Sequence, residues 1–188
     1  MKKTLIVRIG EGLGNQLFMY ANAYSLSKKF GYSLYVDDES GFSKNKRSRS
    51  YNLNFFDIPE QLCPEQLKFN NFIKNYKRKL LKFIDNFISN KKFIIEEVDK
   101  NKQTKFQEIS KLGSIQMFIE GHYESELYFK DYEKDLKKIL RIKYDLINKD
   151  NLYINQIKQS NSVSIHLRKN RFSEDLNNQK TSNIEKNI

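Results

Sequence analysis

A glycine-spaced turn near the N-terminus contains the first residues whose types and spacing could do chemistry. Residues 10–18 read Gly-Glu-Gly-Leu-Gly-Asn-Gln-Leu-Phe and follow a short apolar run. Glycines let a ligand approach the backbone closely, and the free N–H groups at a helix start attract anionic or hydroxyl-bearing groups. The candidate ligand contacts are Gly12, Gly14, Asn15 and Gln16. The alternative is a plain strand-to-helix connection capped by Asn15, which the spacing alone favours.

This turn differs from the common nucleotide-binding fingerprints. Glycines at 10, 12 and 14 do not give the Gly-x-Gly-x-x-Gly spacing of dinucleotide sites, and no Gly-Lys-Ser/Thr follows them. The sequence therefore predicts neither a dinucleotide cofactor nor a P-loop here.

A second polar cluster comes late in the chain, at the end of a predicted strand over 163–168. The two-residue period of a strand puts His166 and Arg168 on the same face, and α/β proteins bind ligands at the carboxyl ends of their strands. Arginine can clamp a phosphate with two hydrogen bonds, and Lys169 and Arg171 are close enough to help neutralise a diphosphate leaving group. No Asp-x-Asp pair is present to hold a metal. A core histidine beside a surface arginine is the equal alternative.

Regular elements must position these two clusters. The short β-rich run 4–9 predicts a buried parallel strand, and the apolar spacing over 16–30, closed by Gly31, predicts a helix. A second strand over 33–36 completes a βαβ unit. Further along, the pattern predicts a strand over 114–120, a helix to about residue 141 and a helical stretch over 146–158. The fold class is therefore α/β with a Rossmann-like lobe.

Residues 65–92 carry aromatic and aliphatic side chains at helical spacing, with lysines and an arginine between them. Two interpretations are open for this basic amphipathic helix. It could lie on an anionic membrane surface, or it could pack its aromatic stripe on the sheet with its lysines in water. Packing on the sheet is the favoured prediction, because large apolar side chains are usually buried.

Composition limits the function classes. The chain has 188 residues and a net charge of +11, but its lysines are spread along the whole length. We expect one core, a cytoplasmic protein, and no membrane-spanning helix or signal peptide. The lone Cys63 offers neither a disulfide nor a metal set and is predicted to pack as a small apolar residue.

Three segments together resemble the bacterial α-1,2-fucosyltransferases of glycosyltransferase family 11. They are Gly-Leu-Gly-Asn-Gln-Leu-Phe-Met-Tyr-Ala at 12–21, Gly-His-Tyr-Glu-Ser-Glu-Leu-Tyr-Phe at 121–129, and Val-Ser-Ile-His-Leu-Arg at 163–168, and they occur in the family's order. The resemblance spans nearly the whole chain and corresponds to the N-terminal portion of a family member.

The resemblance implies a GT-B-type architecture, with an N-terminal acceptor-side lobe over 1–158 and the start of a truncated donor-binding lobe over 159–188. It implies transfer of fucose from GDP-fucose to a galactose hydroxyl with inversion, in surface polysaccharide synthesis, without a metal or other cofactor. The partners are then GDP-fucose and a galactose-containing glycan, with peripheral contact to the inner face of the membrane and no nucleic acid. With its second lobe missing, the 188-residue form is expected to have little or no turnover.

By motif match, Asn15 lies near the reacting sugar, Arg168 contacts the diphosphate and His166 supports that site. Gly12, Gly14 and Gln16 then contact substrate, as do Lys169 and Arg171, although these last two depart from the family's arginine and glycine-aspartate. A general base is not obvious: Glu11, Asp37 and Glu124 are candidates by expected exposure. The alternative function is a non-catalytic basic module that binds an anionic membrane or nucleic acid.

Overall fold

The computed structural model describes residues 2–43, 49–59, 61–97, 106–143 and 152–165. The chain divides into two compact units, Met1–Ile147 and Asn148–Ile188. The first unit carries the sheet, and the second is described below by itself. The lobe boundary at residue 158 stays a prediction.

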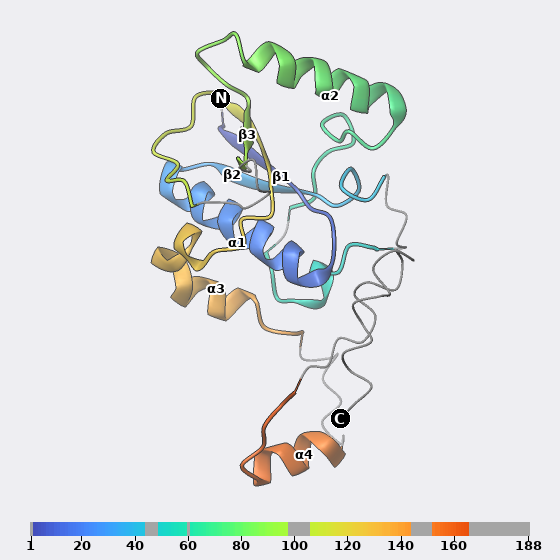
Figure 1. Cartoon of the computed structure of the whole chain (residues 1–188), viewed down its shortest axis with the longest axis vertical. Coiled ribbons are helices and arrows are strands. Elements are labelled where there is room, and N and C mark those ends of the chain that lie inside the picture. The colour runs from blue at the N-terminus through green and yellow to red at the C-terminus, as the bar shows by residue number, and fades with distance from the viewer. Residues whose placement is uncertain (1, 44–48, 60, 98–105, 144–151, 166–188) are drawn as a thin grey trace, which may run out of the picture. The chain divides into compact units, whose positions relative to one another are not determined.

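A four-stranded sheet forms the centre of the first unit (Figure 1). Its strands are β1 (Thr4–Arg8), β2 (Ser33–Asp37), β3 (Phe93–Ile95) and β4 (Gln116–Glu120). All pairs are parallel, in the order β2-β1-β4-β3. The predicted α/β class and Rossmann-like sheet are confirmed at this level, while the GT-B architecture stays a prediction.

Helix α1 (Leu13–Phe30) connects β1 to β2 along one face of the sheet. It ends at Gly31, whose φ of 69° is the left-handed conformation that glycine adopts most easily, and the Gly31 N–H donates to the Ser27 carbonyl. Gly12 occupies the N-cap position, and Asn15 lies inside the first turn. The alternative in which Asn15 caps this helix is therefore wrong.

The sheet separates two apolar clusters by the two-residue period of its strands. Leu5, Val7 and Ile119 face the α1 side, where α3 (Glu133–Ile139) also packs. On the other side Ile6 joins a group of aromatic rings, in which Phe118 stacks on Phe93 at a centroid distance of 5.1 Å. Cys63 is buried in this second group, as predicted.

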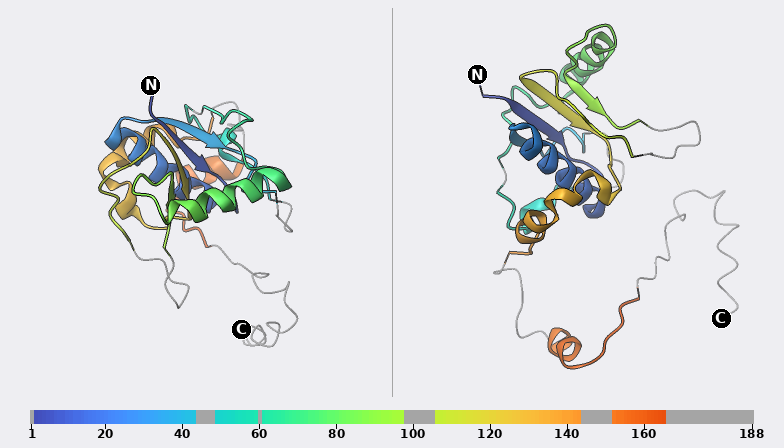
Figure 2. Two further views of the ribbon diagram at one scale, coloured as in Figure 1. Left: turned by 90° about the horizontal axis from the view of Figure 1, so that it is seen from above. Right: turned by 90° about the vertical axis from the view of Figure 1, so that its left-hand side faces the viewer.

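Helix α2 (Phe72–Asp85) lies on the side of the sheet opposite α1 (Figure 2). It is shorter than the predicted 65–92 at both ends. Asn71 caps its start by accepting a hydrogen bond from the Lys74 N–H. Beyond its end, the Asp85 carboxylate accepts hydrogen bonds from the N–H groups of Lys92 and Phe93 and so leads the chain into β3, a three-residue strand that the sequence did not predict.

The prediction that α2 packs its aromatic stripe on the sheet is wrong. Phe72, Tyr76, Phe83 and Phe87 are all more than half exposed. The face that meets the sheet carries Arg78 and Lys82, which form ion pairs with the buried carboxylate of Glu120. A buried carboxylate without such partners would be costly, so this orientation satisfies Glu120.

The second unit contains α4 (Leu152–Gln159), which lies within the helical stretch predicted over 146–158 except for its last residue. The strand predicted over 163–168 is not formed in its described part. Val163 and Ile165 are 87% and 77% exposed. Alternating side chains make a strand only when another strand offers hydrogen bonds, and no described strand pairs with these residues. No helix within the described residues is long and apolar enough to cross a bilayer.

Candidate functional site at the carboxyl end of the sheet

A pocket of about 550 Å³ opens at the carboxyl ends of the strands. The chain leaves β1 for β2 on one side, while β4 lies on the other, so the strand order reverses between β1 and β4. Such a reversal is where open α/β sheets bind ligands. The polar lining side chains are Arg8, Glu11, Glu96, Glu120 and His122, and the backbone lining comes from Gly10, Gly41 and Gly121.

The floor of the pocket is set by a contact between two loops. A Cβ on Gly41 would lie 1.8 Å from the Ile9 carbonyl oxygen, so only glycine permits this approach. A Cβ on Gly10 would lie 3.2 Å from the Gly41 carbonyl oxygen. The sequence alone does not show that Gly10 and Gly41 must be glycine, because their loops are about thirty residues apart and meet only after the βαβ unit has folded.

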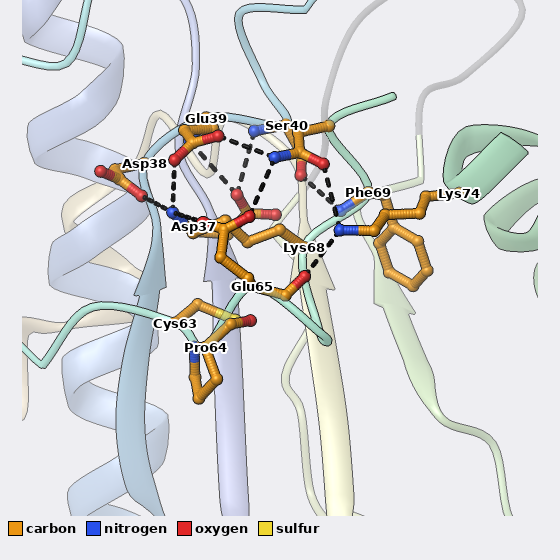
Figure 3. A network of polar contacts seen from close by, with 11 residues as sticks. Asp37, Asp38, Glu39, Ser40, Cys63, Pro64, Glu65, Lys68, Phe69 and Lys74 are labelled. Atoms are coloured by element: carbon orange, nitrogen blue, oxygen red, sulfur yellow. Dashed lines mark hydrogen bonds and ion pairs between the residues drawn. The ribbon is translucent and has the colours of Figure 1, made fainter. Parts of the chain in front are cut away.

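An ion-pair cluster around the buried Lys68 holds the loop that carries Gly41 (Figure 3). The Lys68 ammonium lies 2.9 Å from Asp38, 2.6 Å from Glu39 and 2.8 Å from Glu65. Burial alone would lower the pKa of Lys68, but hydrogen bonds to these three carboxylates raise it above its ordinary value. Lys68 therefore stays charged and ties the loop after β2 to the segment before α2.

Asp37 belongs to the same loop and is 1% exposed. Its carboxylate accepts hydrogen bonds from the N–H groups of Ser40, at 2.9 Å, and Glu39, at 3.3 Å. Its candidacy as a general base rested on expected exposure, and that expectation is wrong. A short polar side chain at the end of a strand often turns back onto its own backbone, as here.

Gln16 acts on the protein itself. It is fully buried, and its Nε2 donates to the carbonyls of Glu11 at 3.0 Å and Ser50 at 2.8 Å. Its Oε1 accepts from the Asn52 N–H at 2.9 Å. These bonds hold the glycine turn against residues 50–52. Gln16 therefore has a positioning role.

The other predicted residues of the turn border the pocket without lining it. Apart from their own chain neighbours and helix backbone, no atom of the described residues lies within 4 Å of where a Cβ of Gly12 or Gly14 would be. Asn15 is half-buried in the first turn of α1. Glu11 does line the pocket; its φ of 63° is unusual for a side-chain-bearing residue, and its carboxylate pairs with Arg49.

The turn after β4 is built around a glycine. Gly121 has a φ of 151°, and a Cβ there would lie 2.4 Å from the Glu96 Cβ and 2.8 Å from the Tyr123 ring. The Glu96 carboxylate accepts hydrogen bonds from the N–H groups of His122, at 2.6 Å, and Tyr123, at 3.0 Å. This holds His122 at the rim of the pocket, where it is about half exposed and lies 3.8 Å from Glu124.

Two charged side chains of the pocket lining, Glu120 and Arg8, have different kinds of partner. Glu120 is 8% exposed and forms ion pairs with Arg78 and with Lys82, the latter at 2.9 Å. Burial alone would raise the pKa of Glu120, but these two cations lower it below its ordinary value. The Arg8 guanidinium donates to the Ser40 carbonyl at 2.8 Å, and its buried Nε has no hydrogen-bond partner among the described residues.

Sequence reasoning did not select Arg8, Glu96, Glu120 or His122. A usable signal was their position at strand ends, which parallel strands bring to one edge. The predicted residues His166, Arg168, Lys169 and Arg171 lie outside the described residues, so their roles stay predictions. Among the described residues, no three His, Cys, Asp or Glu side chains are grouped to hold a metal ion.

Comparison with known proteins gives one informative similarity. The chain is 29% identical over 169 residues to an α-1,2-colitosyltransferase of Escherichia coli. The aligned region covers 88% of this chain and 54% of that protein. The chain thus spans about half the length of the curated relative it matches. No family model matches the chain, and no solved structure matches it.

Proposed function

We propose that this chain is part of a glycosyltransferase that binds its acceptor sugar in the pocket at the carboxyl ends of the strands, called the carboxyl-edge pocket below. The observation that carries the proposal is the similarity to an α-1,2-colitosyltransferase along 88% of the chain. The pocket supports it, because a concave site with a few carboxylates, an arginine and an imidazole suits a ligand rich in hydroxyl groups.

The reaction we propose is an inverting α-1,2-fucosyltransfer from GDP-fucose to the 2-hydroxyl of a galactose residue in a surface polysaccharide. Colitose is fucose without its 3-hydroxyl, so nucleotide-activated colitose is the competing donor. A site that hydrogen-bonds the 3-hydroxyl would discriminate strongly between the two sugars. Of the residues chosen from sequence, we keep Asn15 beside the reacting sugar and Arg168 on the diphosphate as parts of this proposal.

His122 is the general base that the geometry favours. The acceptor hydroxyl must lose a proton as it attacks, and imidazole accepts a proton well near neutral pH. Glu96 and Glu120 are already engaged with backbone N–H groups and with basic side chains. In a mass-spectrometric transfer assay run until the parent chain gives measurable product, His122→Gln is expected to lower product formation about 100-fold; equal and measurable product from both proteins would contradict this role.

A thermal melt tests the proposed donor. A ligand that binds only the folded state raises the midpoint, so GDP-fucose or GDP-colitose should raise it while UDP-galactose should not. The expected result is a larger shift with a GDP-sugar than with GDP alone. The same midpoint with every nucleotide sugar would contradict donor binding by this chain.

A further inference from the structure

Helix α2 attaches to the protein through its polar face. Arg78 and Lys82 form ion pairs with the buried carboxylate of Glu120 at the end of β4. The Asp85 carboxylate accepts hydrogen bonds from the N–H groups at the start of β3, and Leu81 packs on the aromatic cluster beneath the helix. These four contacts fix which side of the helix faces away from the sheet.

The outward side of α2 and of the turn that follows it at residues 86–87 is apolar. Its exposed fractions are 88% for Phe72, 79% for Ile73, 67% for Tyr76, 60% for Phe83 and 75% for Phe87. With roughly 100° of rotation per residue, the four of these side chains that lie within α2 fall within an arc of about 100°. Single exposed apolar residues are ordinary, but a continuous aromatic stripe along a whole helix marks a surface that meets an apolar partner.

Charge identifies the partner. Lys77 and Lys79 are exposed and flank the stripe, one on each side, as the same rotation places them. The single acidic residue of α2, Asp85, is buried and engaged with backbone N–H groups. An apolar arc edged by cations is complementary to a bilayer surface with anionic headgroups, where rings enter the acyl boundary and ammonium groups stay among phosphates.

We propose that α2 docks this protein on an anionic lipid bilayer, with the Phe83 and Phe87 rings inserted and Lys77 and Lys79 at the headgroups. A second copy of the chain is a poorer occupant, because pairing two such helices would bring their flanking lysines together. The proposal is independent of the glycosyltransferase assignment, since none of the residues placed at the bilayer lines the carboxyl-edge pocket.

The chain contains no tryptophan, so one introduced indole reports on its own surroundings. Phe83→Trp is expected to give a blue-shifted emission with phosphatidylglycerol-containing vesicles and little shift with pure phosphatidylcholine. Phe55→Trp, at a site that is 45% exposed and outside α2, is the control and should not shift. An unshifted Phe83→Trp spectrum, or equal shifts at both positions, would overturn the proposal.

Vesicle co-sedimentation gives the second measurement. Phe83→Ser with Phe87→Ser should weaken binding to anionic vesicles at least tenfold, and Lys77→Gln with Lys79→Gln should weaken it about fivefold per lysine. The matched control is Leu152→Ser with Ile157→Ser, which removes two residues of similar exposure from α4. Unchanged binding of the α2 variants, or a dimer that the same substitutions dissociate, would show that lipid is not the occupant.

Discussion

Glycines around the pocket act in two different ways. Gly41 and Gly121 are needed by the protein itself, because a Cβ at either position would overlap neighbouring atoms. Gly12 and Gly14 face open space, so no described protein atom requires them to be glycine. A functional need for glycine at these two positions would come from a ligand that approaches the backbone at the start of α1.

Replacing Gly121 tests the first kind of glycine. Gly121→Ala should lower the free energy of unfolding by about 2 kcal/mol or more, because it adds a Cβ at a φ of 151° and presses on Glu96. Urea unfolding followed by circular dichroism measures the loss. Gly14→Ala is the matched control: alanine suits a helix better than glycine by up to about 1 kcal/mol, so its stability should hold or rise. A Gly121→Ala protein as stable as the parent would contradict the geometry of this turn.

The residue types alone identified the turn at 10–18 but could not separate these roles. Gln16 was expected to face a ligand, yet its amide is consumed by Glu11, Ser50 and Asn52. An amide near a glycine turn satisfies either a ligand or a distant loop, and only the folded chain determines which. Arg8, Glu96 and His122 were missed for a different reason: they come from three separate segments, and the strand order brings them to one pocket only in the folded chain.

At the scale of elements, the junction between β4 and α2 links stability to pH. Glu120 has a pKa below its ordinary value of 4.5 because Arg78 and Lys82 outweigh the effect of burial. A carboxylate of this kind stabilises the folded state above its unfolded pKa. That contribution is lost as the pH falls below about 4.5 and through the lower folded pKa.

Glu120→Gln should therefore destabilise the protein at pH 7 and flatten the fall in stability as the solution becomes more acidic. Urea unfolding at a series of pH values measures both effects. Glu133→Gln is the control, because Glu133 is exposed on α3 and its pair with Lys137 contributes little. A pH profile for Glu120→Gln that parallels the parent profile would show that this ion pair does not couple to folding.

Elements with strong periodicity were predicted well. The strands at 4–9 and 33–36 and the helix between them appear within a few residues of the predicted bounds. The orientation of α2 was predicted wrongly, because periodicity gives the two faces of a helix but not which one meets the sheet. Glu120, buried on β4, decided that orientation. The strand β3 was missed because three residues carry almost no period.

At the scale of the molecule, the first unit is a parallel α/β sheet with a pocket where the strand order reverses. The pocket lies at the end of the sheet, whereas the aromatic face of α2 is exposed and none of its residues lines the pocket. Under the two proposals, the protein lies on a membrane through α2 and binds its acceptor sugar at a different surface. The central claim is that the carboxyl-edge pocket binds the acceptor sugar.

The most direct test is a titration of the ¹⁵N-labelled chain with methyl β-galactoside, followed through its glycine amides. The chain has seven glycines, which resonate in a separate region of the spectrum. Gly10, Gly41 and Gly121 line the pocket, while Gly31 and Gly113 lie elsewhere and are internal controls. The account predicts saturable shifts at the three pocket glycines and none at the two controls. Unmoved pocket glycines, or equal shifts at all positions, would contradict it.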